Sequence, residues 1–276
     1  MTDMPNLAQF LAKERYTTED LRRIVAVLRA PKGCPWDARQ THASIRRNFI
    51  EETYEAVEAI DKGDDALLCE ELGDVLLQVG LHTQMASERG AFDWDDVTDG
   101  ICRKLIERHP HVFGDVSVTG VDNVLSNWDA IKRRSKGQGS ATEAMDSVPR
   151  ELPALMRAQK LQAKAAKAGF DWREETPLRR LELDLLGEIE ELRAALLAGD
   201  LAHAQEELGD VIFSAVNIAR VIPGCDAEEA LTGASDRFLR RFACVEQSAI
   251  AEGIDMKTAP MEELDRLWRA AKAQGR

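Results

Sequence analysis

Four acidic residues in the first half of this 276-residue chain have a spacing suited to holding a metal ion. Glu52 and Glu55 are three positions apart, and so are Glu71 and Asp74. Residues with this spacing lie on one face of a helix. Carboxylates paired on two adjacent helices repel one another unless a cation neutralises them or some stay protonated. Oxygen ligands without cysteine or histidine suit Mg²⁺, with Mn²⁺ as a substitute.

The same four acids return in the second half of the chain. Each lies 136 positions after its counterpart: Glu188, Glu191, Glu207 and Asp210. The tetrapeptide ELGD stands at 71–74 and again at 207–210. A single acidic pair in a helical protein is not evidence for a metal site. Four matched acids at a constant offset, however, are hard to attribute to composition. We infer an internal duplication of a helical domain.

Helices must position these acids. The chain is rich in Ala, Leu, Glu and Arg, and strand-like alternation is scarce. The periodicity predicts helices over residues 18–30, 41–61, 65–89, 94–108, 121–135, 151–168, 178–198, 200–221, 227–252 and 260–273. A short turn at 61–65 makes the two helices of the first quartet antiparallel neighbours. The expected fold class is therefore all-α.

The boundary between the two copies is marked by a small, polar, glycine-containing segment. We expect an N-terminal helical domain over residues 1–136, a linker over 137–149 and a C-terminal helical domain over 150–276. In the first domain, the segment CPWDARQTH predicts a turn leading into a helix that starts near His42.

Composition narrows the class of function. Hydrophobic residues make up 44% of the chain and charged residues 31%, so a core can form. The net charge of −13 argues against broad binding to nucleic acid, although a bound cation can still attract a small anion. The N-terminus lacks a secretory pattern, and no apolar run reaches the ~18 residues of a membrane span. The five cysteines form no CxxC pair, which favours a reducing cytoplasm.

The predicted metal site indicates a phosphate ligand. Mg²⁺ commonly shares its coordination shell with substrate phosphates, so a nucleotide or polyphosphate is expected. A pair of metals would bridge phosphate oxygens and activate a water. A di-iron centre would need Glu-x-x-His, whereas the fourth acid is Asp in both copies. Glu58, in the same helix as the first pair, is expected to face solvent.

These motifs resemble the all-α nucleoside triphosphate pyrophosphohydrolases. The run EExxE, which includes Glu51, followed by ExxD looks like the signature of that superfamily. Four further segments are similar to the MazG family in particular: 33–46, 104–115, 207–220 and 237–242. The resemblance covers nearly the whole chain. It implies two tandem MazG-type helical bundles, Mg²⁺-dependent hydrolysis of a nucleoside triphosphate to the monophosphate and pyrophosphate, and a homodimer.

The resemblance also implies roles for individual residues. Both acidic quartets would hold metal, and Glu51 would orient or deprotonate the attacking water. The basic pairs expected near phosphate are Lys104 with Arg108, and Arg237 with Arg241. The tryptophans expected to stack on a base or to pack in the core are Trp128 and Trp268, each four residues before a lysine (Lys132 and Lys272). We expect Asn217 either to form a hydrogen bond with the phosphate or sugar of the ligand, or to act as a structural cap.

The two copies differ beside their acids. Gly187 takes the place of Glu51 in the second copy, and Asp184 stands where a cation would help to hold phosphate. We therefore predict that the N-terminal site is chemically more complete. Two alternatives remain open: a regulatory protein that binds nucleotide or metal with weak or lost turnover, and a helical adaptor whose acids serve only solubility.

Overall fold

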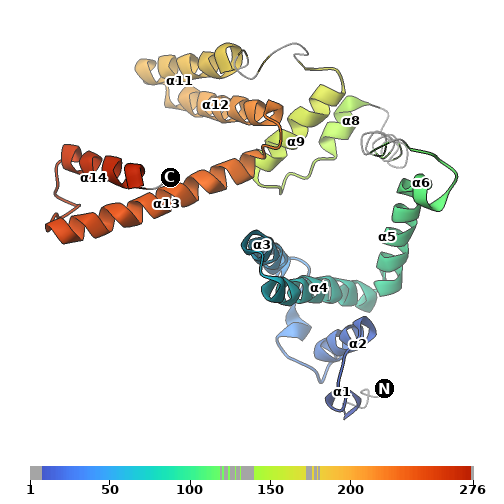
Figure 1. The fold of residues 1–276 in the computed structure, drawn as a ribbon. Helices are drawn as coiled ribbons and strands as arrows, with labels where there is room; N and C mark the ends of the chain where they lie inside the picture. The colour runs from blue at the N-terminus through green and yellow to red at the C-terminus, as the bar shows by residue number, and fades with distance from the viewer. Residues whose placement is uncertain are drawn as a thin grey trace. The chain divides into compact units, whose positions relative to one another are not determined.

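The computed structural model describes residues 8–118, 140–171 and 181–274, together with positions 120, 124, 128, 131, 176 and 179. These residues form helices and turns and contain no strand, which confirms the all-α class. The chain divides into two compact units, Met1–Lys132 and Arg133–Arg276, and each is described by itself (Figure 1). None of the described helices is long and apolar enough to cross a membrane.

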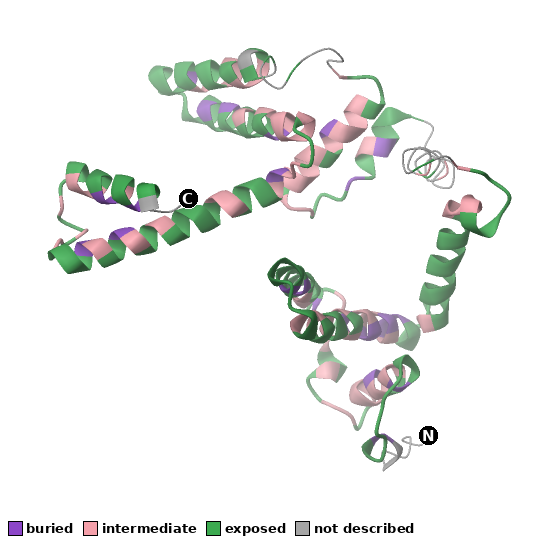
Figure 2. Ribbon diagram, viewed as in Figure 1, coloured by how far each residue is buried: buried purple, intermediate pink, exposed green. Residues whose placement is uncertain are grey.

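Unit 1 is built around the helix pair that carries the first acidic quartet. Its elements are α1 (Ala8–Leu11), α2 (Thr18–Arg29), the 3-10 turn η1 (Asp37–Arg39), α3 (Arg46–Lys62), α4 (Asp65–Glu88), α5 (Trp94–Arg108) and α6 (Pro110–Phe113). The core lies where α2 packs on α4, and its buried side chains are Val25, Ile45, Leu81 and Met85. By contrast, α5 has no buried residue (Figure 2).

Two local signals fix the turn of the α3–α4 hairpin. Gly63 ends α3 with φ of 65°, a left-handed conformation that glycine adopts without steric cost. The carboxylate of Asp64 then accepts hydrogen bonds from the backbone N–H groups of Ala66 and Leu67 and so caps α4. The turn therefore places α3, which carries Glu52, beside α4, which carries Glu71.

Unit 2 repeats this hairpin. Its elements are α8 (Ala141–Asp146), α9 (Ala154–Lys167), the π-helical turn η2 (Leu181–Leu185), α11 (Leu186–Ala198), α12 (Leu201–Val221), α13 (Ala227–Glu252) and α14 (Met261–Gln274). Gly199, with φ of 74°, ends α11, and Asp200 caps α12 by accepting from the N–H of His203. These two turn residues lie 136 positions after Gly63 and Asp64, so the duplication extends to the turn.

The rest of unit 2 supports the α11–α12 hairpin and adds an arm. Helix α9 packs on α12, and α8 packs on α9. Figure 1 shows α14 folding back along the end of α13. A second core joins these two helices and includes Val245, Ala249, Leu267 and Ala271.

Two boundaries expected from the sequence differ from the structure, and a third lies largely outside the described residues. Helix α3 begins at Arg46 rather than at 41, because Thr41 and Ser44 exchange hydrogen bonds in a turn; the prediction that His42 starts the helix is wrong. The segment 137–149, expected as a linker, contains α8, which is capped by Ser140 and packs on α9. The predicted helix over 121–135 falls largely outside the described residues.

Candidate active site

Three acids of the first quartet converge in unit 1. Glu52 and Glu55 on α3 and Glu71 on α4 each offer a carboxylate oxygen, and these oxygens lie within 4.8 Å of one another. Partial burial raises the pKa of Glu52, and the negative charges of Asp74 and Glu55 add to the effect. Burial and Glu55 likewise raise the pKa of Glu71. The predicted convergence is therefore present for three acids, with Asp74 close enough to act electrostatically.

Unit 2 contains a similar group from the second quartet. Glu188 on α11 and Glu207 and Asp210 on α12 place their oxygens within 4.8 Å of one another. Burial raises the pKa of Glu188, followed by the charges of Asp210 and Glu191. Asp184, in the π-helical turn η2, also raises this pKa, as expected for an additional acid beside the quartet.

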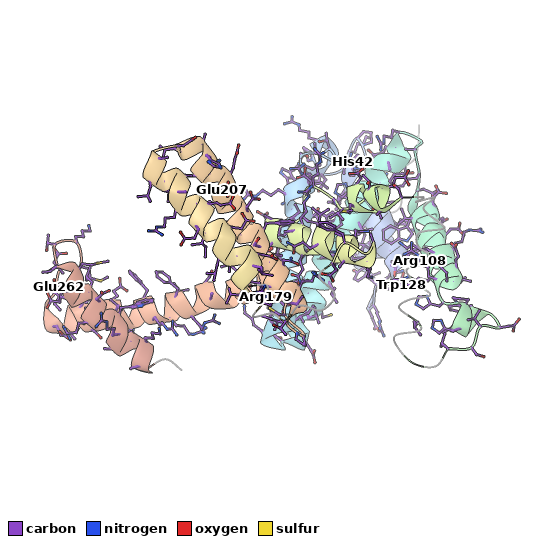
Figure 3. All side chains as sticks on the ribbon, turned by 90° about the horizontal axis from the view of Figure 1, so that it is seen from above. His42, Arg108, Trp128, Arg179, Glu207 and Glu262 are labelled. Atoms are coloured by element: carbon purple, nitrogen blue, oxygen red, sulfur yellow. The ribbon has the colours of Figure 1, made fainter. Side chains whose placement is uncertain are left out.

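Figure 3 labels Glu207 on α12. It is the most buried of the eight acids, with 7% of its surface exposed. One of its oxygens, Oε1, lies 2.8 Å from Nε2 of His203, one helical turn earlier. The other, Oε2, is buried and has no hydrogen-bond partner among the described residues. A buried carboxylate oxygen without a partner is costly, and a hard cation would satisfy it. The donor atoms of this group thus fit Mg²⁺ or Mn²⁺.

A hollow of about 450 Å³ opens beside the unit 2 acids. Its polar lining is Gln162, Asp184, Glu188, Glu191, Ser214, Asn217 and Arg220. Its apolar and glycine lining is Met145, Leu161, Ala165, Phe170, Leu183, Gly187 and Phe213. A mostly apolar cavity of this size with a few polar groups is typical of small-molecule sites. Glu188 and Glu191 stand at its wall, so a ligand in the hollow would lie next to the acids.

A hydrogen-bonded chain fixes the amide of Asn217 at the wall of this hollow. Arg220 forms a bidentate pair with Asp171, at 2.7 and 3.2 Å, and its Nε donates to Oδ1 of Asn217 at 3.1 Å. Because a guanidinium only donates hydrogen bonds, it holds the Asn217 oxygen toward itself. The amide NH₂ is then the group that Asn217 can present to a ligand.

At the matching positions, unit 1 has larger, buried side chains. The counterpart of Asn217 is Leu81, which is 3% exposed and belongs to the core. The counterpart of Ser214 is Gln78, which is 6% exposed. Nearby, His82 stacks on His42, with 2.8 Å between their Nδ1 atoms. A hollow of about 330 Å³ in unit 1 is lined by Arg22, Gly80, Trp94 and neighbours, and by none of the four acids.

Two further glutamates of α3 form ion pairs and do not belong to the converging acid group. Glu51, the predicted helper for water, is exposed and paired with Arg47, whose Nε lies 2.8 Å from its Oε1. Glu58 is exposed and paired with Lys62 at 2.6 Å, which confirms that it faces solvent. Glu51 is thus held in an ion pair and is not a member of the converging acid group.

The structure places the predicted basic and aromatic residues apart from the acids within each unit. Lys104 and Arg108 lie on α5, and the Trp128 ring lies 6.5 Å from His109. Trp268 packs against the α13–α14 core and lies 5.4 Å from Phe238, centroid to centroid. Arg237 and Arg241 lie on α13, which contributes no lining to the hollow. Of the predicted substrate residues, only Asn217 lines the hollow; Lys132 falls outside the described residues.

Sequence reasoning missed several residues of this site. They are His203, Gln162, Asp171 and Arg220, with the apolar lining from Phe170 and Phe213. Gln162 offered a signal, since it is a polar residue within the apolar face of α9, and the structure buries it with its Nε2 donating to the Phe213 carbonyl at 2.8 Å. The others depend on contacts between distant segments.

Comparison with known proteins agrees with this duplicated arrangement. The MazG nucleotide pyrophosphohydrolase domain matches twice, over residues 40–113 and 177–244, and each match contains one acidic quartet. The chain belongs to the MazG family. The two matches confirm that the MazG-type domain is present in tandem.

Relatives in the MazG family match along most of the chain. The nucleoside triphosphate pyrophosphohydrolase of Escherichia coli K12 is 43% identical over 256 residues, which cover 92% of this chain and 96% of the relative. The nucleoside triphosphate pyrophosphohydrolase/pyrophosphatase MazG of Thermotoga maritima is 41% identical over 255 residues, or 92% and 95% of the two chains. A nucleoside triphosphate pyrophosphohydrolase of Mycolicibacterium smegmatis is 37% identical over 183 residues, or 60% and 56%.

Proposed function

We propose that this MazG-family enzyme is a Mg²⁺-dependent nucleoside triphosphate pyrophosphohydrolase, which converts a triphosphate and water into the monophosphate and pyrophosphate. Relatives with this name, alignable over most of the chain, support hydrolysis of phosphoanhydride bonds. The observation that carries the proposal is the hollow of about 450 Å³ whose wall includes Glu188 and Glu191. It offers a place for a nucleoside beside a place for a cation that binds its phosphates.

In unit 2, one set of residues would bind the cation and another set would bind the nucleotide. Glu188, Glu207 and Asp210, with Glu191 adjacent, would hold the cation. A bound divalent cation supplies charge neutralisation for the triphosphate and activates water for attack on the α-phosphorus. The apolar wall formed by Phe170 and Phe213 would shield the base from water, and the Asn217 amide would donate to an acceptor on the sugar, base or phosphate.

This assignment reverses the ranking that the sequence suggested. The leading acid of EExxE made the N-terminal site look more complete, but Glu51 is exposed and pairs with Arg47. Unit 1 also has the buried Leu81 where unit 2 has Asn217. These positions favour a second role for unit 1, in which its acids bind metal or nucleotide and regulate without turnover.

Exposed apolar faces support the proposal that two copies of the chain associate. Helix α3 exposes Tyr54, Val57 and Ile60, and α13 exposes Phe238 and Leu239, each more than 40% accessible. Apolar faces of this kind on bundle helices mark surfaces that another helix covers. A second copy would also bring its own basic side chains. Arg237 and Arg241 of one copy could in this way reach the phosphates bound by the other.

A product assay tests the proposal directly. The purified chain is incubated with a panel of ribonucleoside and deoxyribonucleoside triphosphates, with Mg²⁺ or with EDTA, and the products are separated by chromatography. Monophosphate and pyrophosphate formed only with Mg²⁺ are expected. Diphosphate and phosphate would point to different chemistry, and binding without any product would favour the regulatory alternative.

A further inference from the structure

We infer that His203 is a positioning residue, which holds Glu207 in the orientation that binds the divalent cation of unit 2. The inference rests on the proposed function, since it concerns the same acids. It assigns a role to a residue outside the repeated quartet.

The geometry divides the carboxylate of Glu207 between two partners. Nε2 of His203 lies 2.8 Å from Oε1, and Oε2 is buried without a partner among the described residues. An imidazole that donates from Nε2 to Oε1 would occupy that oxygen and leave Oε2 for a cation. Side-chain exposure supports this arrangement: 53% for His203, at the rim, and 10% for Glu207, which points inward.

The His203 side chain projects from the capped first turn of α12. The backbone N–H of His203 donates to Oδ1 of Asp200, the N-cap of the helix, at 3.1 Å. His203 and Glu207 are four residues apart in the same helix, so their side chains lie on one face. The contact between Nε2 of His203 and Oε1 of Glu207 therefore restricts the rotamer of Glu207.

Unit 1 supplies a natural control for this contact. The position that corresponds to His203 is Leu67, four residues before Glu71 on α4. Leucine cannot donate a hydrogen bond, so Glu71 lacks the partner that Glu207 has at this position. The two acidic groups therefore differ in how firmly one of their ligands is held.

The partner behind a metal ligand affects affinity for the ion. Loss of such a hydrogen bond typically weakens metal binding by about 10- to 100-fold, because the ligand must be ordered when the ion binds. The same loss is expected for His203→Ala. His203→Gln keeps an N–H donor on a side chain of similar reach and should restore much of the affinity.

The test is a Mn²⁺ titration of the full-length chain, followed by the electron paramagnetic resonance signal of free Mn²⁺. It is done in a Glu52→Gln/Glu71→Gln background, so that the unit 2 acids dominate binding. We expect His203→Ala to weaken Mn²⁺ binding by about 10- to 100-fold, His203→Gln to recover it, and Leu67→Ala to leave it unchanged. Unaltered binding by His203→Ala would overturn the inference.

Two further measurements cover other outcomes. A ¹⁴N coupling in the spin-echo spectrum of bound Mn²⁺ that disappears in His203→Gln would show direct coordination by the imidazole and overturn a positioning role. If His203→Ala does not fold, the reverse transplant Leu67→His, in a Glu188→Gln/Glu207→Gln background, should tighten Mn²⁺ binding in unit 1, and unchanged binding there would overturn the inference.

Failure of the inference can be separated from failure of the proposed function. A parent chain that binds Mn²⁺ and releases pyrophosphate, with His203→Ala behaving identically, overturns only the role of His203. A wild-type chain that neither binds Mn²⁺ nor releases pyrophosphate overturns both.

Discussion

The α3–α4 hairpin of unit 1 and the α11–α12 hairpin of unit 2 have the same acids at the same spacing, and the same Gly-Asp turn. They differ in what surrounds the acids. Unit 2 has a hollow beside its acids, with the amide of Asn217 at the wall, whereas unit 1 has Leu81 packed in its core at that position. A ligand set can thus persist after duplication, while the side chains around it diverge.

The strongest test of this difference is to remove one matched acid from each unit. Glu207→Ala should lower kcat/KM for pyrophosphate release by at least ~100-fold, because Glu207 is the buried member of the acid group beside the hollow. Glu71→Ala should change it by only a few-fold. The measurement is initial rate against substrate concentration at saturating Mg²⁺.

The pair Glu55→Ala and Glu191→Ala repeats this test at a matched pair of exposed acids. Loss of activity in the Glu55 variant alone would restore the ranking that the sequence suggested and contradict the assignment to unit 2. Circular dichroism of each variant separates loss of a ligand from loss of the fold.

A smaller effect is expected when Asn217 is replaced by the residue that unit 1 has at this position. Asn217→Leu removes the amide donor and adds bulk to the hollow, so KM should rise by about 10-fold, the equivalent of one lost hydrogen bond. Arg220→Lys should move KM in the same direction, since lysine cannot reproduce the bidentate pair with Asp171. Unchanged KM in both variants would remove Asn217 from the substrate site.

The turns offer a comparison in which the two units should behave alike. Gly63→Ala and Gly199→Ala each place a side chain at positive φ, and each should lower the free energy of unfolding by about 1 kcal/mol. Gly73→Ala is the control: it lies within α4, where an added Cβ meets no atom within 4 Å, so stability should rise by about 0.5–1 kcal/mol. Urea unfolding curves measure all three, and unequal losses in the two turns would indicate that the hairpins are held differently.

The smallest effect concerns pH, and both units should share it. The pKa values of Glu52 and Glu188 are raised in the folded chain, so the folded state retains protons that the unfolded chain releases above about pH 4.3. The stability contributed by these groups is therefore present below that pH and lost as pH rises through the raised pKa. Without metal, Glu52→Gln and Glu188→Gln should each lose less stability than wild type between pH 4 and neutrality.

Divalent cation provides the control for the pH experiment. Mg²⁺ should raise the melting temperature more at neutral pH than near pH 4, where protons already offset the repulsion. An equal rise at both pH values would argue that the ion binds elsewhere on the chain.

The hairpins could be predicted from the sequence because their signals are local. Helical periodicity, the Gly-Asp turns and the spacing of the acids all lie within one helix or between two adjacent helices. The start of α3 was misplaced by five residues, because Thr41 and Ser44 form a turn in a segment whose pattern still looks helical. Side-chain hydrogen bonds of this kind compete with helix formation.

The hollow could not be predicted, because it depends on contacts between distant segments. Asp171 reaches Arg220 across 49 positions, and Gln162 reaches the carbonyl of Phe213 across 51. The predicted roles of Lys104, Arg108, Arg237 and Arg241 came from the resemblance and from the spacing of these basic pairs, and no contact among the described residues joins them to the acids. Those four roles remain predictions.

The shared Gly-Asp turn has a further consequence for how this protein can be rebuilt. Because the two hairpins have turns of equal length and acids in the same register, residues 186–221 could replace residues 50–85 without shifting any downstream helix. Such a chimera would place Asn217 where unit 1 has the core residue Leu81, so it would test whether the unit 1 core accepts the polar residue of unit 2. The hairpin can thus be treated as an exchangeable cassette, and the residues that make it work would be found by transplanting it in parts.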